Sequence, residues 1–322
     1  MNSVAVVPGR YAVLLLAAIA LSACEDSNRI PAGSLLETIP PADTSTTTNL
    51  NIDNPTLTIA DNDEVSPGDA LTLVFSDEFD GTQLDPAVWF FETGDGTEYG
   101  IPGWGNDELQ WYLPDNAELA EGKLKIHVRR ESVNSYNYTS ARINTRDRFA
   151  FRYGRIEASM KLPPGQGIWP AFWALAQNSP YGEWAATGEI DVVEAVNLKG
   201  NGRNRIYGTI HYGGFGRLGQ NTFTGETYNP STDVTEEFHV YAVEWDATEI
   251  RWYVDDVLYA MQNDWNSFGP DGPNAFPAPF DQPFYIIFNV AVGGNFPGPP
   301  SGETEMPVTM EVDWVRVYSG EP

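Results

Sequence analysis

The stretch GEIDVVEAV, residues 188–196, places three carboxylates within six residues of one short segment. Apolar side chains alternate with the acids, a pattern that predicts a β-strand. Residues two apart on a regular strand share a face, so Glu189 and Asp191 should point to the same side. Glu194 lies five residues after Glu189, and on a regular strand it would face the opposite side.

A β-bulge at Val192 and Val193 would return Glu194 to the face of Glu189, because one extra residue shifts the alternation by one. The two glutamates would then lie about 13 Å apart between Cα atoms, at ~3.3 Å per strand position. Side chains that lean inward would bring the carboxyls to roughly 5 Å, near the separation in retaining glycosidases. The spacing therefore favours a retaining pair. The alternative is a solvated strand face with three unremarkable acids.

Strand-like segments separated by Gly, Pro, Asn and Asp turns continue from about residue 70 to the end, with no sustained helical period between them. They are LTLVFSDEF (71–79), KLKIHVRRE (123–131), YGRIEASMKL (153–162), IYGTIHYGG (206–214), FHVYAVEWD (238–246), EIRWYVDDVLYA (249–260), PFYIIFNVAVGG (283–294) and MEVDWVRVYSG (310–320). So many short strands predict an all-β fold, a single antiparallel β-sandwich.

The charge balance narrows the possible partners. The 322 residues carry 18 basic and 45 acidic side chains, a net charge of −27. Such a surface repels nucleic acid and anionic membranes, which argues against phosphate-rich partners. It would suit a salty environment, and it would equally keep a secreted protein soluble.

The N-terminus has the features of an export signal. Residues 11–23, YAVLLLAAIALSA, follow Arg10 and are too short for a mature membrane span, so residues 1–23 read as a secretory signal peptide. LSAC, ending at the only cysteine, Cys24, resembles a bacterial lipobox, in which the cysteine becomes lipid-modified. This predicts export and anchoring to a bacterial membrane through acyl chains alone. The alternative is an ordinary signal with an incidental cysteine.

Residues 24–69 are predicted to be a flexible tether. No Phe, Tyr or Trp occurs between Glu25 and Val74, so this stretch lacks the large apolar groups that offset ordering entropy. A small β-segment around Pro55–Ala60 is the alternative. Residues 70–322 would then form the folded domain.

The strand predicted over residues 188–196 resembles a known family. GEIDVVE resembles the signature of glycoside hydrolase family 16, in the bulged E-x-D-x-x-E form of its laminarinases. Six further blocks agree in order: GWGNDELQWY (103–112), YTSARINT (138–145), YGRIEASMKLPPGQGIWPAFWAL (153–175), GTIHYGG (208–214), PFYIIFNVAVGGNFPG (283–298) and VDWVRVY (312–318). The resemblance covers residues 71–319. It implies a jelly-roll sandwich with a concave substrate-binding cleft and an endo-acting β-1,3-glucan hydrolase that needs no cofactor for catalysis.

The resemblance also implies roles for the residues of this strand and its surroundings. Glu189 would be the nucleophile and Glu194 the acid/base. Asp191 lies between them, and its charge would hold up the pKa of a neighbouring carboxyl. His211 is expected near the acid/base, hydrogen-bonded to Glu194 or to the leaving sugar; the alternative is a satisfied strand histidine.

A sugar site needs flat apolar faces and polar groups for hydroxyls. The residues that the resemblance places in this role are Asn106, Arg142, Trp169, Trp173, Trp184 and Asn295. Trp184 is expected beside the nucleophile. Arg142 could instead form a strand salt bridge. Laminarinases often carry Trp where this chain has Phe296, which weakens the case for the neighbouring Asn295.

Many family members hold a structural calcium ion far from the catalytic groups. The matching positions here are Glu78, the backbone carbonyl of Gly122, and Asp313. Oxygen ligands of this kind suit calcium.

Competing functions remain open within and beyond the enzyme class. The alternative enzymes are mixed-linkage β-1,3-1,4-glucanases and galactan hydrolases such as agarases, several of which also have a bulged strand, and the family includes non-catalytic glucan-binding proteins. The retained Glu189, Asp191 and Glu194 argue against a purely binding role. The blocks GWGNDELQ and VAVGGNFPG favour laminarin. We expect a monomer whose partner is a β-glucan, with no nucleic-acid partner.

Overall fold

The computed structural model describes residues 57–61, 71–200, 204–214 and 221–319. The predicted signal peptide, Cys24 and most of the predicted tether lie outside the described residues. Among the described residues, no helix has the length and apolar character needed to cross a membrane. Regular structure is almost entirely strand, with short 3-10 turns such as Thr97–Tyr99, Pro102–Gly105 and Pro114–Asn116. The all-β prediction is confirmed.

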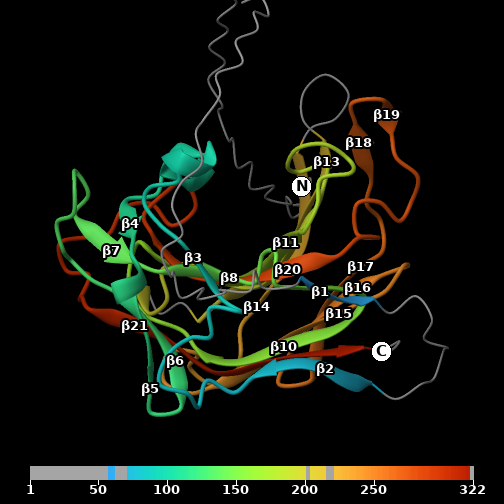
Figure 1. The fold of residues 1–322 in the computed structure, drawn as a ribbon. Helices are drawn as coiled ribbons and strands as arrows, with labels where there is room; N and C mark the ends of the chain where they lie inside the picture. Colours follow the sequence, from blue (N-terminus) through green and yellow to red (C-terminus); the bar gives the residue numbers. More distant parts are fainter. Residues whose placement is uncertain (1–56, 62–70, 201–203, 215–220, 320–322) are drawn as a thin grey trace, which may run out of the picture. The chain divides into compact units, whose positions relative to one another are not determined.

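The first sheet runs in the order β1-β9-β20-β11-β12-β13-β18-β19, with β14 beside β13 and with β8 and then β3 beside β20 (Figure 1). Its strands are β1 (Thr58–Asp61), β3 (Phe90–Glu92), β8 (Arg142–Asn144), β9 (Phe149–Arg152), β11 (Ile168–Ala176), β12 (Glu189–Ala195), β13 (Ile206–Gly214), β14 (Asn221–Tyr228), β18 (Ser267–Gly269), β19 (Gly272–Pro273) and β20 (Phe284–Val292). The pairings around the central strand β12 are antiparallel, as predicted.

The second sheet runs in the order β17-β16-β15-β10-β21-β6-β5, with β2 beside β21. Its strands are β2 (Thr72–Asp77), β5 (Ala117–Ala120), β6 (Lys123–Val128), β10 (Gly154–Lys161), β15 (His239–Trp245), β16 (Ile250–Val254), β17 (Val257–Gln262) and β21 (Val308–Ser319). A separate ribbon pairs β4 (Gln110–Tyr112) with β7 (Tyr138–Ser140).

One hydrophobic core joins the two sheets. It contains alternate residues of both, such as Ile190 of β12 and Ile156 of β10. Trp245 and Trp252 of the second sheet are fully buried in it. Because one face of each sheet is committed to this core, polar side chains of β12 must lie on its other face.

The segment EIRWYVDDVLYA, expected to be one strand, is a hairpin. β16 ends at Val254 and β17 begins at Val257, and the two residues between them have φ values of 49° (Asp255) and 60° (Asp256). Two consecutive left-handed residues are the geometry of a tight hairpin turn, which aspartate tolerates. Two aspartates make this turn without glycine or proline.

The predicted tether is interrupted by a strand. β1 pairs in parallel with β9, and the Thr58 N–H donates to the Arg148 carbonyl. The β-segment left as the alternative around Pro55–Ala60 is therefore present. A strand on a sheet edge gains main-chain hydrogen bonds, so it does not need the large apolar side chains whose absence suggested a tether.

Candidate active site

β12 contains the predicted bulge. Against β13, the pairing passes from Asp191 directly to Glu194 while the partner strand advances by only two residues, and the ladder with β11 shows a matching shift. The two residues in between, Val192 and Val193, both lie in the core. The charges of Glu189 and Glu194 both raise the pKa of Asp191, as expected for acids that share a face. The bulge prediction is confirmed.

The second sheet supports the bulge from behind. Trp252 of β16 donates its indole N–H to the carbonyl oxygen of Asp191 at 2.8 Å. Gly208 of β13 stands opposite the bulge, where an added Cβ would lie 2.5 Å from the Trp252 ring and would also collide with the Tyr259 hydroxyl. Only glycine leaves room for this tryptophan against the irregular part of the ladder.

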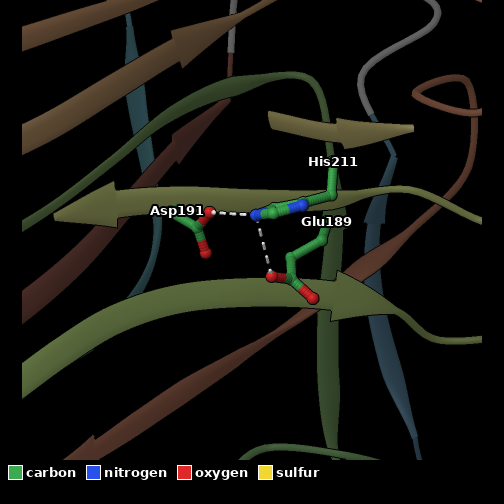
Figure 2. A group of neighbouring side chains, drawn as sticks. All are labelled: Glu189, Asp191 and His211. Carbon is green, nitrogen blue, oxygen red and sulfur yellow. Dashed lines mark ion pairs between the residues drawn. The ribbon is translucent and has the colours of Figure 1, made fainter. Parts of the chain in front are cut away.

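Glu189 lies between an indole and an imidazole. Trp184 donates its indole N–H to one Glu189 oxygen at 2.8 Å. The Nε2 atom of His211 lies 3.7 Å from the other Glu189 oxygen and 3.5 Å from Asp191 (Figure 2). The expected position of His211 near Glu194 was wrong, because His211 is the direct cross-strand partner of Glu189.

Glu194 lies among aromatic side chains. Trp169 of β11 donates its indole N–H to a Glu194 oxygen at 2.8 Å. The Trp169 ring meets Phe296 edge to face at 5.4 Å, and Phe296 meets Tyr207 in the same way at 5.1 Å. Phe296, the departure from the family pattern, therefore keeps an aromatic contact beside this glutamate. Trp169 contacts the acid itself and does more than offer a flat face.

Burial sets the proton affinity of the acids. Burial is the largest cause that raises the pKa of Asp191, followed by the charges of Glu194 and Glu189. Burial, and then the charge of Glu189, raises the pKa of Glu194 to about 7, although the N–H of Trp169 opposes the shift. We expected the charge of Asp191 to provide this effect. Instead burial disfavours the charged form of Asp191 itself, so Glu189 is the charge that acts on Glu194.

The group drawn in Figure 2 has the composition of a metal site. Glu189, Asp191 and His211 each offer one ligand atom within 4.8 Å of the others. One Glu189 oxygen already accepts the Trp184 N–H, and Glu194 stands on the same strand face. We interpret the group as part of an acid pair with its supporting residues, since every member matches a predicted catalytic position.

Arg142 and Trp173 belong to a buried network beyond β11. Arg142 forms an ion pair with Glu92 on the neighbouring strand, so the strand salt bridge considered from the sequence is present. Its guanidinium lies 4.6 Å from the Trp104 ring centroid and 4.8 Å from that of Trp173. Trp173 donates its indole N–H to Asn289. Sequence reasoning missed Glu92, which lies in none of the matched blocks, and Asn289, although it stands in the PFYIIFNVAVGGNFPG block.

The two predicted asparagines lie on neighbouring loops. The Asn295 N–H donates to the Asn106 carbonyl oxygen at 2.8 Å. The side-chain amide of Asn106 donates to Glu108, a buried carboxyl that also accepts from Gln110 and whose pKa is raised chiefly by burial. Asn295 is exposed and bonds Asp107. Glu108 was also missed, although it stands in the GWGNDELQWY block.

The three predicted calcium ligands lie on connected parts of the second sheet. Glu78 follows β2 and Gly122 precedes β6, and both strands pair with β21, which carries Asp313. Both carboxylate oxygens of Glu78 accept hydrogen bonds from Arg316, at 3.0 and 2.8 Å. A calcium ion at this place would compete with Arg316 for Glu78.

The comparisons with known proteins agree with this geometry. A family model described as glycosyl hydrolases family 16 matches residues 108–316, and one described as beta-glucan synthesis-associated protein SKN1/KRE6/Sbg1 matches residues 6–191. The chain is 39% identical over 279 residues to the glucan endo-1,3-beta-glucosidase A1 of Niallia circulans, covering 81% of this chain and 40% of that protein. It is 40% identical over 262 residues to a beta-glucanase of Rhodothermus marinus, covering 76% of this chain and 84% of that protein.

A solved structure supports the same relationship. The laminarinase catalytic domain from Thermotoga maritima MSB8 superposes with a TM-score of 0.69 at 38% identity, covering 79% of this chain and all of that one. A two-sheet sandwich with paired glutamates on one strand face defines a carbohydrate-cleaving hydrolase. The chain belongs to glycoside hydrolase family 16. The predicted jelly-roll fold and the predicted enzyme class are confirmed.

The bulge makes Gly208 a sensitive position. We expect Gly208→Ala to push Trp252 off the Asp191 carbonyl, to destabilise the fold by about 1–3 kcal/mol as overpacking does, and to lower turnover sharply. Gly302→Ala is the control, because a Cβ there meets nothing within 4 Å. Thermal unfolding and reducing-sugar release measure the two effects. Wild-type stability and activity in Gly208→Ala would contradict this account of the bulge.

The proton affinity of Glu194 predicts a pH-dependent stability. Its folded pKa of about 7 lies above the ordinary value of 4.5, so its contribution to stability is complete below pH 4.5 and is lost as pH rises through 7. Glu194→Gln removes this ionisation. The variant should therefore melt higher than the wild type at pH 8 but not at pH 4.5, as calorimetry can measure. A difference in melting temperature that is the same at both pH values would refute the assignment.

Proposed function

We propose that this glycoside hydrolase cleaves internal linkages of laminarin-type β-1,3-glucan with retention of configuration. The observation that carries the proposal is the bulged strand β12, which places Glu189 and Glu194 on one face, each with its own indole donor. The activity named for the Niallia circulans relative and for the solved Thermotoga maritima domain supports the choice of β-1,3-glucan. This chain spans less than half of the Niallia circulans protein, so the proposal concerns the shared domain.

In the first step, protonated Glu194 donates its proton to the glycosidic oxygen while the Glu189 carboxylate attacks the anomeric carbon. The leaving glucan departs with the proton, and a covalent glycosyl–enzyme ester remains. The ester removes the charge of Glu189, which is one cause of the raised pKa of Glu194. The pKa of Glu194 therefore falls in the ester, and Glu194 is ready as a free carboxylate when it must act as the base.

In the second step, the Glu194 carboxylate takes a proton from water, the water oxygen attacks the anomeric carbon, and the bond to Glu189 breaks. The product is a sugar of the original configuration, and both carboxyls return to their starting states. No cofactor takes part in this scheme. Because Glu194 must begin protonated, kcat/KM should fall as pH rises through about 7.

The alternative substrates are mixed-linkage β-1,3-1,4-glucan and agarose-type galactan, and the alternative class is a non-catalytic glucan-binding lipoprotein. The bulged acid strand does not separate the three hydrolase activities. It does argue against the binding-only reading, since a glutamate whose pKa is raised to about 7, on the same face as a second glutamate, suits proton transfer.

A substrate panel with two variants tests the proposal. Wild-type protein should release reducing ends from laminarin faster than from barley mixed-linkage glucan, and none from agarose. Glu189→Ala should abolish turnover. Glu194→Ala should be nearly inactive, with partial rescue by azide and release of a β-glycosyl azide, because the nucleophile remains. A β-azide from Glu189→Ala would reverse the two roles, and no cleavage by the wild type would favour the binding-only reading.

We also propose that Glu78, Gly122 and Asp313 hold a structural calcium ion. A chelator should then lower the melting temperature by mass action on the folded state and leave activity at low temperature unchanged. Glu78→Gln should remove the chelator-induced shift, which separates calcium loss from general salt effects. A wild-type melting temperature that does not respond to chelator would refute the site and leave Glu78 as the partner of Arg316 alone.

Export and lipid anchoring at Cys24 complete the proposal. Its support is the apolar segment of residues 11–23 and the lipobox-like LSAC that follows it. When the full chain is expressed in a bacterium, the wild-type protein should fractionate with membranes. Cys24→Ala should be released into the soluble fraction, and equal membrane retention of both proteins would contradict lipidation.

A further inference from the structure

A row of three side chains crosses the first sheet beside the nucleophile. Glu189 of β12 pairs directly with His211 of β13, and His211 pairs directly with Phe223 of β14. Directly opposed residues of antiparallel strands share a face. Phe223 therefore stands on the same face as Glu189, two strands away, which is about 10 Å at the usual strand spacing.

The rings along this row are continuous. The His211 ring centroid lies 5.6 Å from that of Trp184 and 5.8 Å from that of Phe223. Trp184 is 42% exposed and Phe223 is 57% exposed, whereas most large apolar side chains of the first sheet are buried. An aromatic surface thus runs outward from Glu189, and Trp184 and Phe223 on it are open to solvent.

The exposure of Phe223 has no explanation in packing. It is the most exposed large apolar side chain among the described residues, and its immediate strand neighbours are Thr222 and Thr224. A flat apolar ring exposed to water on the same sheet face as a sugar-cleaving acid is the kind of group that stacks on a pyranose. On the other side of β12, Arg142 and Asn289 supply polar groups, so Phe223 marks the opposite side of the catalytic strand.

We propose that Phe223 forms an additional glucosyl-binding subsite on the β14 side of the catalytic strand, reached from Glu189 across the His211 ring. Its ligand is a sugar residue of the same β-glucan chain, one that lies beyond the residues directly beside the cleaved bond. The inference rests on the proposed function. It makes Phe223 a substrate-length determinant and a binding residue that takes no part in the chemistry.

The test uses β-1,3-linked glucose oligosaccharides of increasing length, from trisaccharide to octasaccharide. The wild-type kcat/KM should rise with length until the Phe223 subsite is filled. Phe223→Ala should match the wild type on the shortest substrates and lose about three- to tenfold on the longer ones, the size of one aromatic contact. Phe223→Trp should keep the wild-type length dependence, which a purely structural role would not require.

Leu258→Ala is the matched control, because Leu258 is an exposed apolar residue (51%) on β17 of the second sheet. It should leave the length dependence unchanged. A loss in Phe223→Ala that is equal at every length would mean a general disturbance and overturn the subsite, as would full activity at every length. If the wild type cleaves none of the oligosaccharides, the proposed function and the subsite both fail. If kcat/KM of Phe223→Ala rises with length as it does in the wild type, the subsite alone fails.

Discussion

The two-against-one pairing between Asp191 and Glu194 is the constraint on which the site depends. One face of β12 must fill the core and the other must present acids, and strict alternation cannot give Glu194 the face of Glu189. The bulge resolves the conflict by sending both Val192 and Val193 inward. The Trp252 indole N–H then satisfies a main-chain carbonyl at the irregular step of the ladder. A residue of the far sheet therefore helps to set the geometry of the acids.

The acid face is costly to fold, and the core offsets that cost. Asp191 is almost fully buried, and one of its oxygens has no hydrogen-bond partner among the described residues; the same holds for Nδ1 of His211. Groups of this kind destabilise a folded protein, and they occur where function requires them. The apolar face of the same strand packs into a core that both sheets build, and this burial offsets the cost of the acid face.

The sequence supported the fold class and the acid face because both follow from short-range periodicity. The bulge could be inferred within nine residues, since only an extra residue reconciles the three acids. Long-range register could not be inferred. Which side chain stands opposite Glu189 depends on how β13 pairs, so His211 was expected at the wrong glutamate. Arg142 finds Glu92 fifty residues earlier in the chain, a distance that no local pattern spans.

The two glutamates differ in their surroundings although each accepts one indole N–H. An N–H donor stabilises the charged carboxylate, so Trp169 lowers the proton affinity of Glu194. At Glu194 burial outweighs the indole, and the pKa settles at about 7, where the proton can be both given and recovered near neutral pH. Trp169 thereby limits the upward shift that burial alone would cause. With a higher pKa, Glu194 would give up its proton less readily in the first step. After the ester forms, a higher pKa would also leave less of Glu194 as the free carboxylate that the second step needs.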